Sequence, residues 1–526
     1  MDRKTFALYT IIIGALFGIL ADVLFYGKLL GVSFPIFILI GIVVVLASHS
    51  IAKQSLMPQP IRRVNLWVLV PALFFAGMVA IRADRSLTNL NVAVALGLSA
   101  LSLHYLPLTR RIDLDALGDH VFGTLDAIFS PVVAPLFEVF DSVSWGFDHL
   151  HGHWRTVASV GRGLVIAAPV LLVFAVLLAS ADAVFAGYLS HAMTFMSIFT
   201  FQRSQVEQVG IISVIGWLAC GTIAYGAARR DTFQHAEREN KPKRKRWSLG
   251  LIEACIMLGS VDLLFALFVL IQFTYFFGGR AALSAANISY SDYARHGFFE
   301  LVAVSVLTLV LVLALDRITM RRAARHNRLF RALAVVLVAL TGVLLVSASQ
   351  RMLLYEEQFG FTTLRVYTHV FMLWLGVLFA FFLLALFRVR MRIFSLGVLL
   401  VMIGYVGTLN LMNVEGYIAE RNIARAEQGS TVDFYYLNSF SVDAVPAVLH
   451  HFESPLSPEL HAALGQWLAG KLIQLDQSRL TEGSSVFSTN LARSTAWAEL
   501  DAIRDQLPEY DPLYFYRGDW LSNSQD

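Results

Sequence analysis

The sequence has little cysteine and little charge, and each shortage excludes a class of protein. Of its 526 residues only two are cysteines and 15% are charged, whereas 57% are hydrophobic. Cys220 and Cys255 both lie inside apolar stretches, which excludes a disulfide framework and argues against a thiolate metal site. An ordinary soluble domain is about 45–50% apolar and about 25% charged. The composition therefore indicates a membrane protein.

Motifs of common soluble enzymes are also missing. The sequence contains no Walker phosphate loop, no nucleophile elbow and no HExxH zinc motif. Its net charge of +3 is small, and the positive residues gather in particular loops, which argues against a nucleic-acid partner. We predict no cofactor and no metal site.

What the chain does contain is a series of long apolar stretches. A helix needs about 20 apolar residues to cross a hydrocarbon core about 30 Å thick, and open strands leave their backbone groups unsatisfied in lipid. We therefore predict an all-α, polytopic bundle with eleven membrane spans. The predicted spans are 5–26, 29–51, 64–81, 88–108, 161–180, 207–228, 251–277, 297–316, 329–349, 366–387 and 392–412.

The loops between these spans are alternately rich and poor in Lys and Arg. One set carries 25 such residues near the span ends, and the alternate set carries eight. Because cytoplasmic loops hold the excess of Lys and Arg, we predict a cytoplasmic N-terminus and an extracytoplasmic C-terminus.

Two regions are not predicted to span the membrane. In 109–160 apolar residues recur at helical spacing, which is typical of amphipathic helices lying at the cytoplasmic membrane interface. After residue 412 the composition becomes polar, and apolar positions recur in 440–452, 458–474 and 490–507. This pattern predicts a small helical extracytoplasmic domain. The predicted division is thus four spans in 1–108, the interfacial segment 109–160, a seven-span core in 161–412 and the C-terminal domain 413–526.

Glycine and proline mark special points inside the spans. Gly14 and Gly18 are four residues apart, a small-xxx-small pattern that favours a close helix contact and is only weak support for dimerisation. Pro35, Pro71 and Pro169 fall inside predicted spans, where we expect kinks.

Several motifs resemble a known group of sequences. These are Phe276-Phe-Gly-Gly-Arg280, the stretch from Ser291 to Glu300, Ser180-Ala-Asp-Ala-Val-Phe185, Arg351-Met-Leu-Leu-Tyr355 and Phe359-Gly-Phe-Thr-Thr-Leu-Arg365. The sequence between about residues 5 and 415 resembles the bacterial membrane-protein family labelled domain of unknown function 4173. The resemblance implies a bacterial cytoplasmic-membrane location and no particular reaction, substrate or cofactor.

Asp262 is the charge predicted to lie deepest in the membrane. It is close to the midpoint of the span 251–277, where a charged Asp costs about 2.5–3.5 kcal/mol to insert. No Lys or Arg lies at a comparable depth, so desolvation favours the neutral acid. Cys255, Gly259 and Ala266 share its helix face and predict a tight helix contact. Asp262 is either a proton or cation site or a structural acid hydrogen-bonded to a Ser, Thr or Asn of a neighbouring helix.

A second group of polar residues is predicted at the outer membrane face. Arginines in short outer loops oppose the charge rule, so carboxylates or a bound anion should hold them. This group is either a network of interfacial salt bridges or a shallow site for an anionic or zwitterionic ligand, with Arg351 and Arg365 as anion contacts. Its principal candidates are Asp292, Arg295, Glu300, Arg351, Arg365 and His369.

Three functions are compatible with these features. The leading prediction is a non-enzymatic transporter or sensor of a small ligand, with Asp262 as the proton or cation site and the outer cluster as the entry site. The second is a membrane-embedded enzyme acting on a lipid-linked or envelope substrate, with Glu300 or Asp292 as acid and base. The third is a scaffold whose C-terminal domain binds an envelope protein. The predicted partners are the lipid bilayer and, through that domain, an envelope protein.

Overall fold

The computed structural model describes residues 3–55, 63–105, 124, 127, 203–228, 251–285, 298–319, 324–388, 391–430, 432–482 and 486–517. Within these ranges the regular elements are α-helices and short 3-10 helices. This agrees with the all-α prediction. The predicted interfacial segment 109–160, apart from residues 124 and 127, and the predicted span 161–180 lie outside the described residues.

Apolar helices coincide with the other predicted spans. They are α1 (Arg3–Phe25), α2 (Ser33–Ser55), α3 (Leu69–Ile81) preceded by η1 (Arg63–Val68), α4 (Arg85–Tyr105), α8 (Arg203–Ala228), α10 (Leu251–Ala285), α12 (Phe298–Ile318), α13 (Ala324–Phe359), α14 (Thr363–Arg388) and α15 (Met391–Met412). In the described part of the chain, five of them (α1, α4, α13, α14 and α15) are long and apolar enough to cross a membrane, and the others contain shorter apolar stretches. The helices are those of a membrane protein, while the count of eleven spans stays a prediction.

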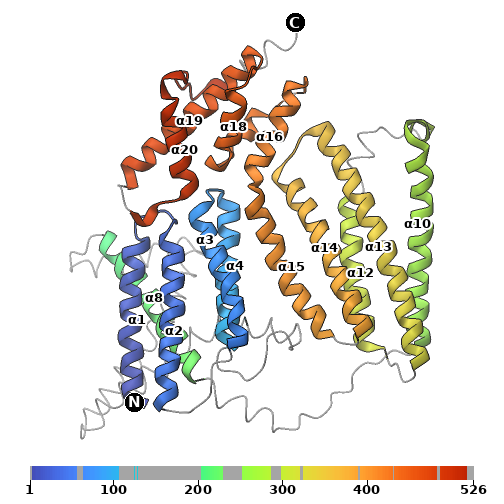
Figure 1. Ribbon diagram of the computed structural model, residues 1–526, viewed down its shortest axis with the longest axis horizontal. Helices are drawn as coiled ribbons and strands as arrows, with labels where there is room; N and C mark the ends of the chain where they lie inside the picture. The colour runs from blue at the N-terminus through green and yellow to red at the C-terminus, as the bar shows by residue number, and fades with distance from the viewer. Residues whose placement is uncertain are drawn as a thin grey trace, which may run out of the picture.

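The apolar helices stand side by side in a layer (Figure 1). One group is formed by α1, α2, α3, α4 and α8, and a second by α10, α12, α13 and α14. Helix α15 contacts α3 and α4 on one side and α14 on the other, and so joins the two groups. The start of α1 and the helices α18 (Val445–Phe452) and α19 (Pro458–Glu482) lie at opposite ends of the layer (Figure 1).

Apolar side chains face both inward and outward along these helices. Leu258, Phe330 and Phe382 are buried where α10, α13 and α14 meet. Leu263 and Leu373 point away from that core and are 72% and 64% exposed. A helix that is hydrophobic all round is buried in protein or in lipid. The outward leucines therefore indicate a surface that faces lipid.

A close contact between α1 and α8 uses the predicted glycine pair. A Cβ atom added to Gly14 would lie 2.7 Å from the carbonyl oxygen of Gly216, and one added to Gly18 would meet the backbone of Ile212. The small-xxx-small pattern thus joins two helices of the same chain. Pro35 and Pro71 each occupy the first turn of a helix, where a missing backbone N–H is tolerated. Neither proline breaks the α-helix that contains it, so the kinks stay predictions, and Pro169 lies outside the described residues.

Shorter helices cover one end of the layer, and this end is called the covered end. These C-terminal helices are α16 (Val414–Glu427), α17 (Phe434–Asn438), η3 (Val442–Ala444), α18 (Val445–Phe452), α19 (Pro458–Glu482), η4 (Val486–Ser488), α20 (Leu491–Ala502), η5 (Arg504–Gln506) and α21 (Tyr514–Arg517). Helices α18, α19 and α20 confirm the periodic segments predicted after residue 440. Helix α16 follows α15 almost directly and was not predicted from the sequence.

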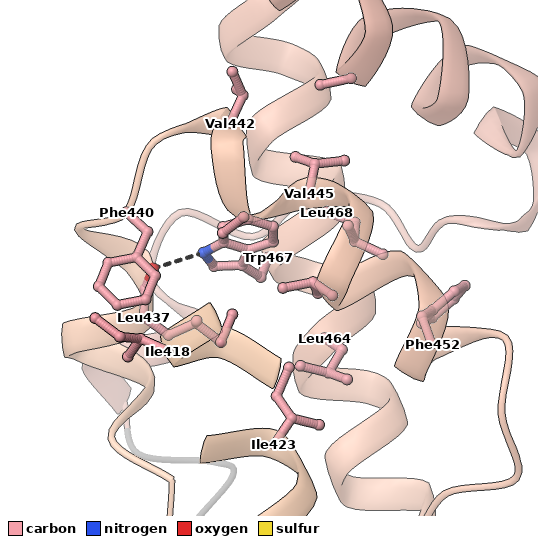
Figure 2. Close-up of a cluster of buried hydrophobic side chains, with 14 of the residues drawn as sticks. Ile418, Ile423, Leu437, Phe440, Val442, Val445, Phe452, Leu464, Trp467 and Leu468 are labelled. Carbon is pink, nitrogen blue, oxygen red and sulfur yellow. Dashed lines mark hydrogen bonds between the residues drawn. The ribbon is translucent and has the colours of Figure 1, made fainter. Parts of the chain in front are cut away.

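The C-terminal helices pack around Trp467 of α19 (Figure 2). Its indole is 1% exposed and donates a hydrogen bond of 3.0 Å to the carbonyl of Leu437. Ile418 and Ile423 of α16 reach the same core, as do Val445 and Phe452 of α18. Because α16 continues from the membrane-type helix α15, this core is attached to the layer below it.

Candidate functional site

Asp262 is buried between helices of the layer, while its predicted depth in the membrane stays a prediction. Its side chain is 7% exposed and shares one face of α10 with the buried residues Leu258, Phe265 and Val269. This face packs against α13. Neither carboxylate oxygen has a hydrogen-bond partner among the described residues. The alternative role, a structural acid held by a neighbouring Ser, Thr or Asn, therefore finds no partner in the described part of the chain.

The small residues near Asp262 do not form the helix contact that we predicted. Ala266 is exposed, and a Cβ added to Gly259 would have no heavy atom within 4 Å. The large side chains Leu258 and Phe265 pack against α13 instead. The contact is therefore an apolar core of ordinary side chains with one acid inserted into it.

Three of the six residues predicted at the outer membrane face have side chains that the structure does not describe. Asp292 and Arg295 lie outside the described residues. Glu300 is the third residue of α12, and its side chain is likewise outside the described part. Their proposed roles stay predictions.

His369 has an acidic partner that the sequence analysis missed. Its Nδ1 lies 3.3 Å from Oε1 of Glu356, and its Nε2 lies 3.3 Å from the carbonyl oxygen of Ser349. Glu356 is 1% exposed and stands near the end of α13, while His369 stands near the start of α14. The two helices form a hairpin, so residues 13 apart in sequence meet. That spacing around the turn at Gly360 was the available signal.

Arg365 contacts the turn of the same α13–α14 hairpin. Its guanidinium carbon lies 4.3 Å from the ring centroid of Tyr355, and its Nη1 donates to the carbonyls of Phe359 and Gly360. A cation near the last carbonyls of a helix interacts favourably with the helix dipole. These partners assign Arg365 a structural role at the end of α13. Arg351 lies half-buried about one turn before Tyr355 on α13.

Side chains of the C-terminal helices bind this α13–α14 turn. Asn422 of α16 accepts a hydrogen bond of 2.7 Å from Phe361 N and donates one of 2.9 Å to Phe361 O. Arg425 donates to the carbonyl of Glu357 at 2.8 Å, and the hydroxyl of Tyr436 accepts from Thr363 N at 2.8 Å. The turn is thus held from above by α16 and α17.

The α3–α4 turn is bound in the same way. One oxygen of Asp443 accepts hydrogen bonds of 2.8 Å from the backbone N–H groups of both Ala83 and Asp84. The amide of Asn490 donates to the carbonyls of Val79 and Arg82, at 3.1 and 2.9 Å. Two side chains more than 350 residues away in sequence therefore satisfy the backbone of this turn.

Beneath these contacts lies a second polar pair between helices. Asn91 of α4 and Asn410 of α15 are fully buried and exchange two amide hydrogen bonds of 2.7 and 2.8 Å. Arg82 also donates to the backbone carbonyl of Asn410. This pairing fixes α4 against α15 directly below the covered end.

Three buried carboxyls meet where the C-terminal helices join the layer, and we call Asp84, Glu415 and Asp443 the junction acids. Burial raises the pKa of Glu415 to about 7, although hydrogen bonds from Ser441 oppose the rise, and Asp84 and Asp443 add to it. Burial also raises the pKa of Asp443. The nearby ammonium of Lys471 donates to the carbonyls of Asn438 and Phe440, and burial lowers its pKa to about 8. The junction therefore contains groups that titrate near neutral pH.

Each junction acid accepts at least one hydrogen bond from the protein, while Oδ1 of Asp443 has no hydrogen-bond partner among the described residues. Asp84 accepts from Ser86 N at the start of α4, and Glu415 accepts from the backbone N–H of Ser441 at 2.8 Å. Among the described residues, no group of three or more His, Cys, Asp or Glu side chains is arranged to hold a metal ion. The arrangement joins parts of the chain that lie far apart in sequence.

One family model matches this chain, and neither a curated protein nor a solved structure does. The match covers residues 69–451 and carries the description domain of unknown function, DUF4153. It runs from the first residue of α3 into α18, so it includes Asp262, the Glu356–His369 pair and the junction acids. The resemblance to domain of unknown function 4173 is thus wrong, and its argument for a bacterial cytoplasmic membrane falls with it. Since the matched region is more than half of the sequence, the chain belongs to the DUF4153 family.

Proposed function

We propose that this membrane protein transports or senses a small ligand without catalysing a reaction, and that Asp262 is its intramembrane proton or cation site. The observation that carries the proposal is the burial of the Asp262 carboxyl without a hydrogen-bond partner among the described residues. Nothing in the surrounding apolar contact of α10 with α13 requires an acid there.

The chemistry of such a carboxyl suits reversible binding. A charged Asp at the centre of a membrane helix costs about 2.5–3.5 kcal/mol on insertion scales. A buried polar group without a hydrogen bond costs a further 1–3 kcal/mol, roughly. A proton or a cation would remove most of the charge penalty. Occupancy of Asp262 would then change how firmly α10 packs on α13.

We also propose that the covered end faces away from the cytoplasm. Turns of the hairpins α3–α4 and α13–α14 lie at the covered end, because the C-terminal helices bind both. The start of α13, with Arg325 and Arg328, and the link from α14 to α15, with Arg388 and Arg392, therefore lie at the other end. This distribution of basic residues supports a cytoplasmic N-terminus. The exposed C-terminal helices could then meet an envelope protein.

Proton flux in proteoliposomes tests the role of Asp262. Purified protein is reconstituted with a pH-sensitive dye inside the vesicles, and the internal pH is followed after an external pH jump. We expect Asp262→Asn to abolish protein-dependent flux, because the amide cannot release a proton. Asp316→Asn is the matched control, since Asp316 is half-buried near the end of α12.

A sensor gives a different result from a transporter in the same vesicles. If wild type conducts no protons, we expect a pH-dependent change in hydrogen exchange across α10 and α13, and we expect Asp262→Asn to remove it. Equal flux and equal exchange in wild type and Asp262→Asn would overturn the proposed role.

A further inference from the structure

The connection between α19 and α20 rests on the turn between α1 and α2. The backbone N–H of Val32 donates a hydrogen bond of 2.9 Å to the carbonyl of Thr489. The ammonium of Lys28 lies 5.2 Å from the ring centroid of Phe487. A Cβ added to Gly31 would lie 2.8 Å from the carbonyl oxygen of Ser488. Figure 1 shows this part of the C-terminal helices meeting the tops of α1 and α2.

The position of this contact relative to the membrane follows from the length of α1. Its apolar span Leu8–Phe25 contains 18 residues. At about 1.5 Å per residue it covers roughly 27 Å, close to the thickness of a hydrocarbon core. The turn that follows Phe25 therefore lies at the level of the lipid headgroups, and η4 lies there with it.

Large exposed apolar side chains lie at the end of α19, in η4 and at the start of α20. Leu480 is 85% exposed, Val486 is 75% exposed and Leu491 is 56% exposed. Leu29 and Leu30 of the adjoining turn are exposed as well. A single exposed leucine is ordinary, but neighbouring ones mark an interaction surface.

The surface is continuous with one that already faces lipid. Below the turn, Leu16, Ile19 and Val23 of α1 are exposed along an apolar helix. Lys28 and Phe487 add a cation and an aromatic ring, the side chains that favour the interface between headgroups and acyl chains. An acyl-chain boundary thus fits the patch better than a polar protein surface does.

We propose that Leu480, Val486 and Leu491 insert their side chains into the lipid leaflet at the covered end, beside the α1–α2 turn. The C-terminal helices would then be held by the membrane as well as by the three turns that they bind. The proposal relies on the membrane setting of the chain and not on the role of Asp262, so the two can fail separately.

Site-directed spin labelling in proteoliposomes tests this insertion. Cys220 and Cys255 are first replaced by alanine, and single cysteines are introduced by Val486→Cys and Leu480→Cys. Glu459→Cys is the matched control, because it is exposed near the start of α19, about 30 Å along the helix from Leu480. Collisions of each label with oxygen, which partitions into lipid, are compared with collisions with a water-soluble nickel chelate.

We expect the labels at 486 and 480 to collide mainly with oxygen and the label at 459 to collide mainly with the nickel chelate. A preference for the chelate at both 486 and 480 would overturn the proposal. Protection from both reagents would overturn it too, because it would mean that protein, such as a second copy of the chain, covers the patch.

Discussion

Glu415 is one residue through which pH should act on the contact between the C-terminal helices and the helix layer. Its pKa rises from an ordinary value of 4.5 to about 7, chiefly through burial. The folded chain therefore holds this proton more tightly than the unfolded chain. Stability from this group is fully present below about pH 4.5 and is lost as the pH rises through about 7.

Glu415→Gln should remove this pH dependence. The amide oxygen can still accept the hydrogen bonds from Ser441, but it carries no charge to desolvate. Between pH 5 and 7.5 we expect wild type to lose on the order of 2–3 kcal/mol, because one pKa unit corresponds to about 1.4 kcal/mol. Thermal unfolding in nanodiscs across that range measures the loss. Exposed Asp501→Asn serves as the control, and matching slopes for wild type and Glu415→Gln would refute the role.

The Glu356–His369 pair should be strongly coupled. Removing one partner of a buried charged pair costs about 3–5 kcal/mol, whereas replacing both with apolar residues is often nearly neutral. We expect Glu356→Leu and His369→Leu each to lower the unfolding temperature markedly, and the double variant to recover most of the loss. A double-mutant cycle from thermal unfolding gives the coupling energy, and additive losses would show that the pair is independent.

The roles of single residues could be predicted from the sequence to different degrees. Asp262 was predictable because an acid in an apolar run is conspicuous without any partner. Glu356 was not, because it lies beside Glu357 near a helix end and looks like a solvated residue until the α13–α14 hairpin buries it. Arg365 was predicted to contact an anion. Its partners in the structure are the ring of Tyr355 and the backbone carbonyls of Phe359 and Gly360, and no sequence motif indicates such contacts.

At the scale of helices, the contact between α1 and α8 offers a direct test. Gly14→Ala places a methyl group 2.7 Å from the backbone oxygen of Gly216, and a backbone atom cannot rotate away. We expect a loss of about 1–3 kcal/mol, the range for overpacking a tight interface. Gly97→Ala is the matched control, since no heavy atom lies within 4 Å of its added Cβ.

Thermal unfolding in detergent compares these two alanine variants. Gly97→Ala should be neutral or slightly stabilising, because alanine favours a helix over glycine by roughly 1 kcal/mol. Equal unfolding temperatures for the Gly14 and Gly97 variants would contradict the close helix contact.

Elements were predictable where one face or the whole surface of a helix is apolar. Hydropathy alone indicated the spans from α1 to α15, and periodicity indicated α18, α19 and α20. Helix α16 escaped prediction because it is short and follows α15 after the single residue Asn413, whose positive φ of 51° ends one helix and begins the next. Pro35 and Pro71 fall in the first turns of α2 and α3, a position that hydropathy does not reveal because it does not show where within a span an α-helix begins.

At the scale of the whole molecule, the orientation can be tested by labelling. Asp505→Cys and Arg328→Cys are introduced separately into the cysteine-free chain, and intact cells are treated with a membrane-impermeant maleimide. We expect residue 505 to be labelled directly and residue 328 only after permeabilisation. Residue 505 belongs to the C-terminal helices at the covered end, whereas residue 328 lies near the start of α13, whose other end forms the turn bound at the covered end. The reverse pattern, or labelling of both in intact cells, would contradict a cytoplasmic N-terminus.

The way the C-terminal helices attach could not be derived from the sequence. Asp443 meets Ala83 across 360 residues, and Asn490 meets Val79 across 411. Such pairs have no periodic spacing, and each joins an ordinary polar side chain to a backbone group of an apolar residue. Only the assembled chain shows that they satisfy each other.

The hydrogen bond between Val32 and Thr489 also sets an order of events during synthesis. Residue 32 leaves the ribosome long before residue 489. Helices α1 and α2 therefore enter the membrane before Thr489, the hydrogen-bond acceptor for the turn between them, has been synthesised. Contacts across such long separations form late and slowly. Until α19 and α20 are made, the backbone N–H of Val32 lacks the acceptor that it has in the folded chain, so the α1–α2 turn reaches its final contacts only after nearly the whole chain has been synthesised.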